Sequence, residues 1–104
     1  MPGVDQPYRY QYETVAASQT DQVLGGTGAT GDYLHRIIIT VATAATAAVD
    51  IQDGTDTAIS IMPNSPGSGI GVYVVDLELR SKTGAWSVTT GAGSTVLAVG
   101  IFSA

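Results

Sequence analysis

The chain of 104 residues lacks cysteine altogether, and it has one histidine and only four lysine or arginine residues. The absence of cysteine excludes disulfides, thiolate chemistry and cysteine-ligated metal sites. The four basic residues form no basic run, and the formal net charge is −5. Because phosphate binding depends on clustered Lys and Arg, we expect neither nucleic acid nor an anionic membrane surface as a partner.

Charged residues of either sign are scarce, and long hydrophobic runs are absent. Charged residues make up 12% of the chain, against roughly 25% in ordinary soluble domains. Such a surface loses little hydration energy when a partner covers it, which favours a subunit of an assembly. No apolar run approaches the roughly 18 residues of a membrane span. Residues 1–6 lack the basic and then apolar pattern of a secretion signal, so we expect a cytoplasmic protein or one assembled into a particle there.

Short segments rich in β-branched residues alternate with glycine-rich turns. We predict strands at residues 33–41, 47–52, 57–62, 72–80, 86–90 and 95–103, and one or two more between residues 14 and 24. The dipeptide Asp53-Gly54 predicts a tight turn that joins two of them in a hairpin. Short strands at this spacing predict that residues 13–104 form a single all-β domain. We expect a small antiparallel β-sandwich, jelly-roll-like, of about seven or eight strands with little or no helix.

The alternation of apolar and polar residues predicts which side chains face the core. The predicted core consists of Ile37, Ile39, Val49, Ile51, Ile59, Ile61, Val75, Leu77, Leu79, Val88, Leu97, Val99 and Ile101. The last strand is apolar on both faces, because Val96, Ala98 and Phe102 alternate with the core set. A two-layer sandwich has one inner face, so we expect Val96 and Phe102 to contact a partner.

Two motifs invite a ligand-binding interpretation, and for both the plain structural explanation is favoured. Residues 26–31 match the G-x-G-x-x-G pattern, but a strand rather than a helix is expected next, so no dinucleotide cofactor is predicted. Asp50, Asp53 and Asp56 lie near one turn but lack the ligand spacing of a calcium loop. We therefore expect no metal or cofactor.

No arrangement of side chains indicates catalysis. His35 lies in a predicted strand with Tyr33 and Ile37 on its face, and we interpret it as a packed or edge histidine. Asp76 and Glu78 share a face that is expected to be exposed. Trp86 could stack on a sugar ring, as in carbohydrate-binding modules, but the core position is favoured. We expect that the protein is not an enzyme and has no catalytic residue.

The first twelve residues differ from the rest of the chain. Pro2, Gly3 and Pro7 precede an alternating segment, Tyr8-Arg9-Tyr10-Gln11-Tyr12, with three rings on one side of an extended chain. We predict that residues 1–12 form an arm that docks on a neighbouring subunit or another protein surface. Tyr8, Tyr10 and Tyr12 would be its anchors and Arg9 a charged contact. The alternative is that this strand pairs within its own sandwich.

Residues 20–102 resemble small structural proteins encoded among the head genes of tailed bacteriophages. The resemblance lies in Gln22-Val23-Leu24-Gly25-Gly26-Thr27-Gly28-Ala29-Thr30-Gly31-Asp32-Tyr33-Leu34, in the hairpin sequence 49–54, in the Pro-Asn loop 63–71 and in Gly84-Ala85-Trp86-Ser87-Val88-Thr89-Thr90. It implies a virion protein with a jelly-roll-like sandwich, and it transfers no catalytic residue. The N-terminal arm lies outside it.

The resemblance suggests a decoration or cement subunit on the capsid surface, assembled in the host cytoplasm. Its expected partners are the major capsid protein and further copies of itself. A trimer is favoured over a dimer, because threefold positions are natural docking points on a capsid. Two alternatives remain, namely another virion component such as a fibre, spike or tail subunit, and a carbohydrate-binding β module that uses Trp86 and surface tyrosines.

Overall fold

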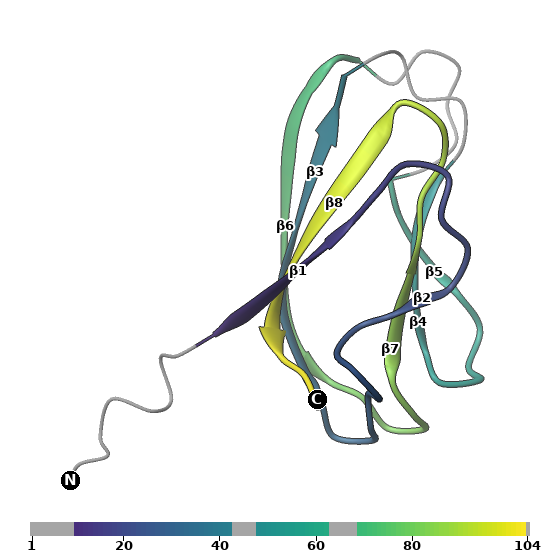
Figure 1. The fold of residues 1–104 in the computed structure, drawn as a ribbon, viewed down its shortest axis with the longest axis vertical. Coiled ribbons are helices and arrows are strands. Elements are labelled where there is room, and N and C mark those ends of the chain that lie inside the picture. The colour runs from purple at the N-terminus through teal and green to yellow at the C-terminus, as the bar shows by residue number, and fades with distance from the viewer. Residues whose placement is uncertain (1–9, 43–47, 63–68, 104) are drawn as a thin grey trace, which may run out of the picture.

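The computed structural model consists of two four-stranded antiparallel sheets packed face to face (Figure 1), which confirms the predicted all-β sandwich. The structure describes residues 10–42, 48–62 and 69–103. The strands in these ranges are β1 (Gln11–Val15), β2 (Gln22–Val23), β3 (Tyr33–Val41), β4 (Val49–Asp53), β5 (Ile59–Met62), β6 (Gly71–Arg80), β7 (Trp86–Thr89) and β8 (Ser94–Ile101). Within these ranges no helix is long and apolar enough to span a membrane.

The strand order is that of a jelly roll. One sheet has the order β1-β8-β3-β6 and the other has the order β2-β7-β4-β5. The antiparallel pairs β1–β8, β2–β7, β3–β6 and β4–β5 are those of one long hairpin rolled into two layers. The predicted hairpin around Asp53-Gly54 is the innermost of these pairs, with Ile51 opposite Ile59.

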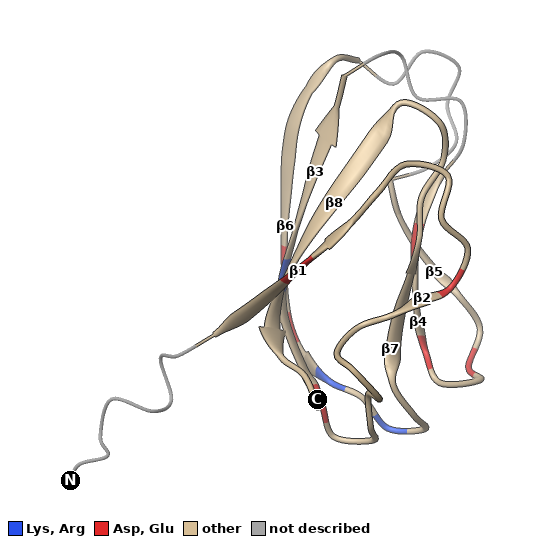
Figure 2. Cartoon of the chain, in the orientation of Figure 1, with Lys and Arg blue, Asp and Glu red and all other residues tan. Residues whose placement is uncertain are grey.

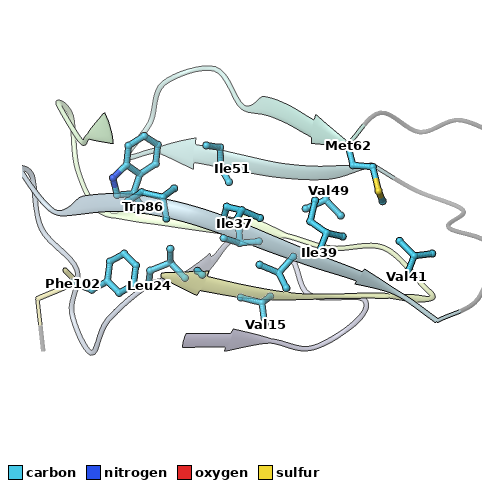
Figure 3. Close-up of a cluster of buried hydrophobic side chains, with 14 residues drawn as sticks. Val15, Leu24, Ile37, Ile39, Val41, Val49, Ile51, Met62, Trp86 and Phe102 are labelled. Carbon is cyan, nitrogen blue, oxygen red and sulfur yellow. The ribbon is translucent and has the colours of Figure 1, made fainter. Parts of the chain in front are cut away.

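The core lies between the sheets and is built of aliphatic side chains, with Trp86 and Phe102 as its aromatic members. Figure 3 shows Trp86 beside Ile51 at one end of the cluster and Met62 and Val41 at the other. Five of the predicted core residues are fully buried, and they are Ile37, Ile39, Val49, Ile51 and Val88. Ile61 and Leu77 are partly buried and pack against this cluster.

The prediction for the last strand was wrong about which face is inside. Val96 and Ala98 of β8 are buried, and so is Phe102 just beyond it, whereas Leu97 and Val99 are half-buried and Ile101 is exposed. Val96 and Phe102 therefore belong to the core and cannot be the partner contacts that we expected. Gly100 is the next inward position of β8 after Ala98, since it pairs with the buried Leu34. There, a Cβ atom at Gly100 would come within 2.0 Å of the carbonyl oxygen of Tyr33.

The predicted burial was also wrong for residues on the edge strands. Ile59 on β5 and Leu79 on β6 face inward, since they pair with the buried residues Ile51 and Leu34. They are nevertheless 46% and 42% exposed. Both strands are edges of their sheets, so neither side chain has a neighbouring strand on its outer side. Val75, also on β6, is half-buried for the same reason.

A bulge at His35 changes the facing of β3. Leu34 pairs with Gly100 and Arg36 with Val99, so His35 is an extra residue with no partner on β8. On the β6 side the irregularity includes Glu78, which has a positive φ of 54°. The bulge puts Leu34 and Ile37 on the same inner face although they are an odd number of residues apart. His35 therefore does not share a face with Ile37, contrary to the prediction.

Candidate interaction surface

The outer faces of the two sheets differ in chemistry. On the β2-β7-β4-β5 sheet, the strands place Asp50, Gln52, Ser60, Ser87 and Thr89 on the side away from the core. These residues are typical of a face that meets solvent. On this outer face, Val23 on the short edge strand β2 is the one exposed large apolar side chain in the described ranges.

The β1-β8-β3-β6 sheet, by contrast, carries apolar side chains on its outer face. Its central row crosses all four strands as Thr14, Leu97, Ile38 and Val74. We call this surface the outer apolar face and define it by Ile38, Val72, Val74, Leu97, Val99 and Ile101. Val72 is 62% exposed and Val74 56% exposed.

Charges are rare on the outer apolar face. Arg36 and Asp76 form an ion pair there, with 2.7 Å between Arg36 Nε and an Asp76 carboxylate oxygen. Figure 2 shows that the upper parts of β3, β6 and β8 carry no charged residue and that most charges lie toward the opposite end of the sandwich. A contiguous exposed apolar surface of this kind is a candidate interaction site.

An aromatic cluster lies on the same sheet near the beginning of β3. The Tyr10 ring stacks on His35, with 4.5 Å between the ring centroids. The Tyr33 hydroxyl lies 3.2 Å from His35 Nδ1, and the Arg80 guanidinium lies over the Tyr33 ring. Desolvation among these groups, together with Tyr10 and Glu78, raises the pKa of the Tyr33 hydroxyl, against a smaller opposite effect of Arg80.

The structure places part of the predicted arm on this sheet. Gln11 and Tyr12 pair with Gly100 and Val99 of the same chain, so β1 begins before the boundary that we placed between residues 12 and 13. This is the pairing that the alternative interpretation expects. Tyr12 is exposed beside the outer apolar face, and Tyr10 packs in the aromatic cluster. Tyr8 and Arg9 lie outside the described residues.

Sequence reasoning missed most of this surface. It assigned Leu97, Val99 and Ile101 to the core, and it did not single out Ile38, Val72 or Val74. One signal was available, because the run Ile37-Ile38-Ile39 is apolar on both faces. A central strand explains that pattern only in part, since β3 is central but its outer face is covered by no other layer in the described structure.

The glycine-rich loop is occupied by contacts within the fold. Backbone N–H groups of Thr27 and Gly28 donate to the carbonyl oxygen of Ser103, and Gly25 N donates to the Glu13 carboxylate. The loop leads into β3 rather than into a helix. It therefore presents no array of free N–H groups at a helix start of the kind that binds a pyrophosphate.

Trp86 is buried and its indole Nε1 donates to the carbonyl oxygen of Asp32 at 3.0 Å. This confirms the core position and leaves Trp86 unable to stack on a sugar. Among the described residues, no group of three or more His, Cys, Asp or Glu side chains could hold a metal ion.

The Asp53 carboxylate is hydrogen-bonded to the turn that follows β6. Its carboxylate accepts hydrogen bonds from the backbone N–H groups of Lys82, Thr83 and Gly84 and from the Thr83 hydroxyl. Burial raises the pKa of Asp53, but these hydrogen bonds lower it by more, so the net shift is downward.

The lowered pKa of Asp53 predicts a loss of stability in acid. The ionised carboxylate stabilises the fold fully above the unfolded-state pKa of about 4, and this stabilisation is lost as the pH falls through the lower folded-state pKa. We expect Asp53→Asn to flatten the fall in unfolding free energy below about pH 4, measured by urea denaturation at a series of pH values. The matched control is Asp56→Asn, which removes an exposed carboxylate from the same hairpin turn. Superimposable profiles for the two variants would contradict the assignment.

The fold and the surface together define a small jelly-roll β-sandwich with one polar outer face and one apolar outer face. A comparison of the sequence and the structure with known protein families, curated proteins and solved structures finds no match.

Proposed function

We propose that this chain is a structural subunit that docks on a protein lattice through the outer apolar face. The resemblance to head proteins of tailed bacteriophages suggests the lattice, namely the major capsid protein. The subunit would then be a decoration or cement protein of the virion surface. The observation that carries the proposal is the contrast between the polar outer face of one sheet and the apolar outer face of the other.

The architecture is compatible with this role. Jelly rolls recur in viral capsid and lectin domains, although a fold by itself does not define a function. The protein would bind the assembled lattice and not the open one, so it would stabilise the particle by mass action. The Arg36–Asp76 ion pair lies within the apolar surface and would give the docking its orientation.

Self-association is part of the proposal. The exposed apolar side chains of Ile59 on β5 and Leu79 on β6 form a second apolar surface on one lateral side of the sandwich. A homo-oligomer, with a trimer favoured, would cover that side while the outer apolar face meets the capsid. A fibre, spike or tail subunit is the alternative, and the two differ in copy number. Quantitative composition of purified particles would show hundreds of copies for a decoration protein and tens for a fibre.

A pair of matched substitutions tests the docking surface. Val74→Asp places a charge in the outer apolar face, whereas Val23→Asp makes the same change on the outer face of the other sheet, where Val23 is 42% exposed. We expect Val74→Asp to weaken binding to heads that lack the subunit by roughly 100-fold, because an unpaired carboxylate would be buried at the contact. Co-sedimentation with purified heads measures this affinity.

The control should bind as the wild type does, and both variants should keep the wild-type circular dichroism spectrum, because both positions are exposed. Equal binding of Val74→Asp and wild type would overturn the proposed docking face. Equal loss in both variants would contradict it as well, since a general effect of the added charge would then explain the result.

A further inference from the structure

The two lateral sides of the sandwich are closed differently. On the side of β1 and β2, the gap between the sheets is bridged by polar side chains. Gln22 Nε2 donates to Glu13 Oε2 at 2.8 Å, and Gly25 N donates to Glu13 Oε1 at 2.8 Å. Glu13 and Gln22 sit on the edge strands of the two sheets, so these bonds seal that side.

The opposite side, between β5 and β6, is open. Ile59 on one sheet and Leu79 on the other point into the gap between the sheets, and both remain exposed. The buried Trp86 lines the same pocket. A pocket of about 600 Å³ opens at this point. Its lining is formed by Asp53, Asp56, Thr57, Ile59, Leu79, Arg80, Lys82 and Trp86.

The open side has both unpaired strand edges and unpaired charges. Within the described ranges, β6 pairs with β3 alone and β5 with β4 alone, so each has one free edge. A long, apolar free edge is a template for strand addition. Asp53 is already engaged by the β6–β7 turn, but in the described structure the carboxylate of Asp56 and the ammonium of Lys82 have no ion-pair partner. The opening thus combines apolar walls with charged groups of both signs.

We infer that residues 1–9 of a second copy fill this opening, as an extended strand along β6 with apolar side chains between Ile59 and Leu79. This inference rests on the proposed self-association and names its interface. The segment supplies Val4 and Tyr8 for the apolar walls. Alternation places the neighbouring charged residues Asp5 and Arg9 on the other side of that strand, away from the apolar walls. An added strand would itself be the edge of the enlarged sheet, where a proline is tolerated if its nitrogen faces away from β6.

The position where the described chain begins indicates a second copy as the source. β1 and β6 are the two opposite edges of one sheet, so residues 1–9 start from the edge away from their own opening (Figure 1). Nine extended residues reach about 30 Å, which is ample for a neighbour placed edge to edge. To enter the opening of the same chain, the segment would have to reverse and cross the outer apolar face. Donation from one edge to the opposite edge is a head-to-tail contact, and such contacts form a closed ring, such as a trimer, when the rotation between neighbours closes.

The cysteine-free sequence permits a direct test on the full chain. Two single-cysteine variants, Tyr8→Cys and Leu79→Cys, are mixed and oxidised, and the covalent heterodimer is quantified on a non-reducing gel. The control pairs Tyr8→Cys with Val23→Cys, since Val23 and Leu79 are each 42% exposed. We expect a roughly tenfold higher yield with Leu79→Cys, because a preformed contact raises the effective concentration of the two thiols.

Two results would overturn the inference. One is an equal yield with Leu79→Cys and Val23→Cys. The other concerns a double variant that carries both Tyr8→Cys and Leu79→Cys. The inference fails if this variant forms its disulfide within one chain at high dilution and gives no cross-linked dimer at higher concentration. That outcome would assign the opening to the chain's own N-terminal segment.

A second variant separates this inference from the proposed function. Leu79→Asp in the full chain should shift the protein from oligomer to monomer in analytical ultracentrifugation, with an unchanged circular dichroism spectrum. Val74→Asp, by contrast, should lose binding to heads. An oligomer that survives Leu79→Asp would overturn the arm interface and leave the docking face standing. If Val74→Asp binds heads normally while the cross-link forms, the docking face is wrong and the arm interface holds.

Discussion

Asp32→Ala is expected to lower the unfolding free energy by about 3 to 5 kcal/mol. The Asp32 carboxylate is buried between the glycine-rich loop and the C-terminal end of the chain. It accepts hydrogen bonds from Ala29 N and Ser103 N, each at 3.0 Å, and from the Ser103 hydroxyl at 2.8 Å. Alanine would leave these donors without an acceptor. Urea denaturation followed by the fluorescence of Trp86, the single tryptophan, measures the loss.

The control for Asp32→Ala is Asp76→Ala. Asp76 is exposed and its ion pair with Arg36 is a surface pair, so its removal should cost at most about 1 kcal/mol. Similar losses in the two variants would show that Asp32 is not the connection between the loop and the C-terminal end that its hydrogen bonds indicate.

Gly25→Ala is the second substitution with a large expected effect, a loss of about 3 kcal/mol or more. Gly25 has a φ of +90°, and a Cβ atom there would come within 2.3 Å of the Ser103 carbonyl oxygen and 2.9 Å of Phe102 Cβ. The Ser103 carbonyl is backbone and already accepts hydrogen bonds from Thr27 and Gly28. The loop and the chain end would therefore have to separate.

Gly31 in the same loop provides a matched control for Gly25. Its φ is +94°, but no atom lies within 4 Å of the place where a Cβ would stand. Gly31→Ala should therefore cost only the backbone strain of a left-handed residue, about 1 to 2 kcal/mol. The difference between the two variants in thermal or urea unfolding isolates the steric contact. Equal losses would mean that strain alone explains both.

These two predictions assign a structural role to the glycine-rich segment. Hydrogen bonds join the glycine-rich loop, Asp32 and Ser103 to one another. They lie at the end of the sandwich where the C-terminus lies (Figure 1). Gly25, directly before the G-x-G-x-x-G pattern, must approach backbone closely, and within the pattern Gly28 has a positive φ and no room for a Cβ atom beside Ala85. A close approach to the protein's own backbone requires glycine for the same reason as a close approach to a phosphate.

The sequence by itself determined the strands and the class of fold. The segment 33–41 matches β3, and the turn Asp53-Gly54 joins β4 and β5 as predicted. Both signals are local, because β-branched runs and turn dipeptides restrict the backbone without help from distant residues. The inward positions of Val49, Ile51 and Val88 followed from alternation, because their neighbours along the strand are the polar residues Asp50, Gln52, Ser87 and Thr89.

Only the tertiary structure decided which residues form the surface. In β8 both faces are apolar, so alternation could not choose between Val96 with Ala98 and Leu97 with Val99. The pairing of Val15 with Val96 and the tight space at Gly100 made that choice. The bulge at His35 changed which residues of β3 face the core. Ile59 and Leu79 face the core, but the strand order put both at sheet edges. Their exposure depends on which strands lie beside them, and the spacing of residues along one strand carries no information about its neighbours.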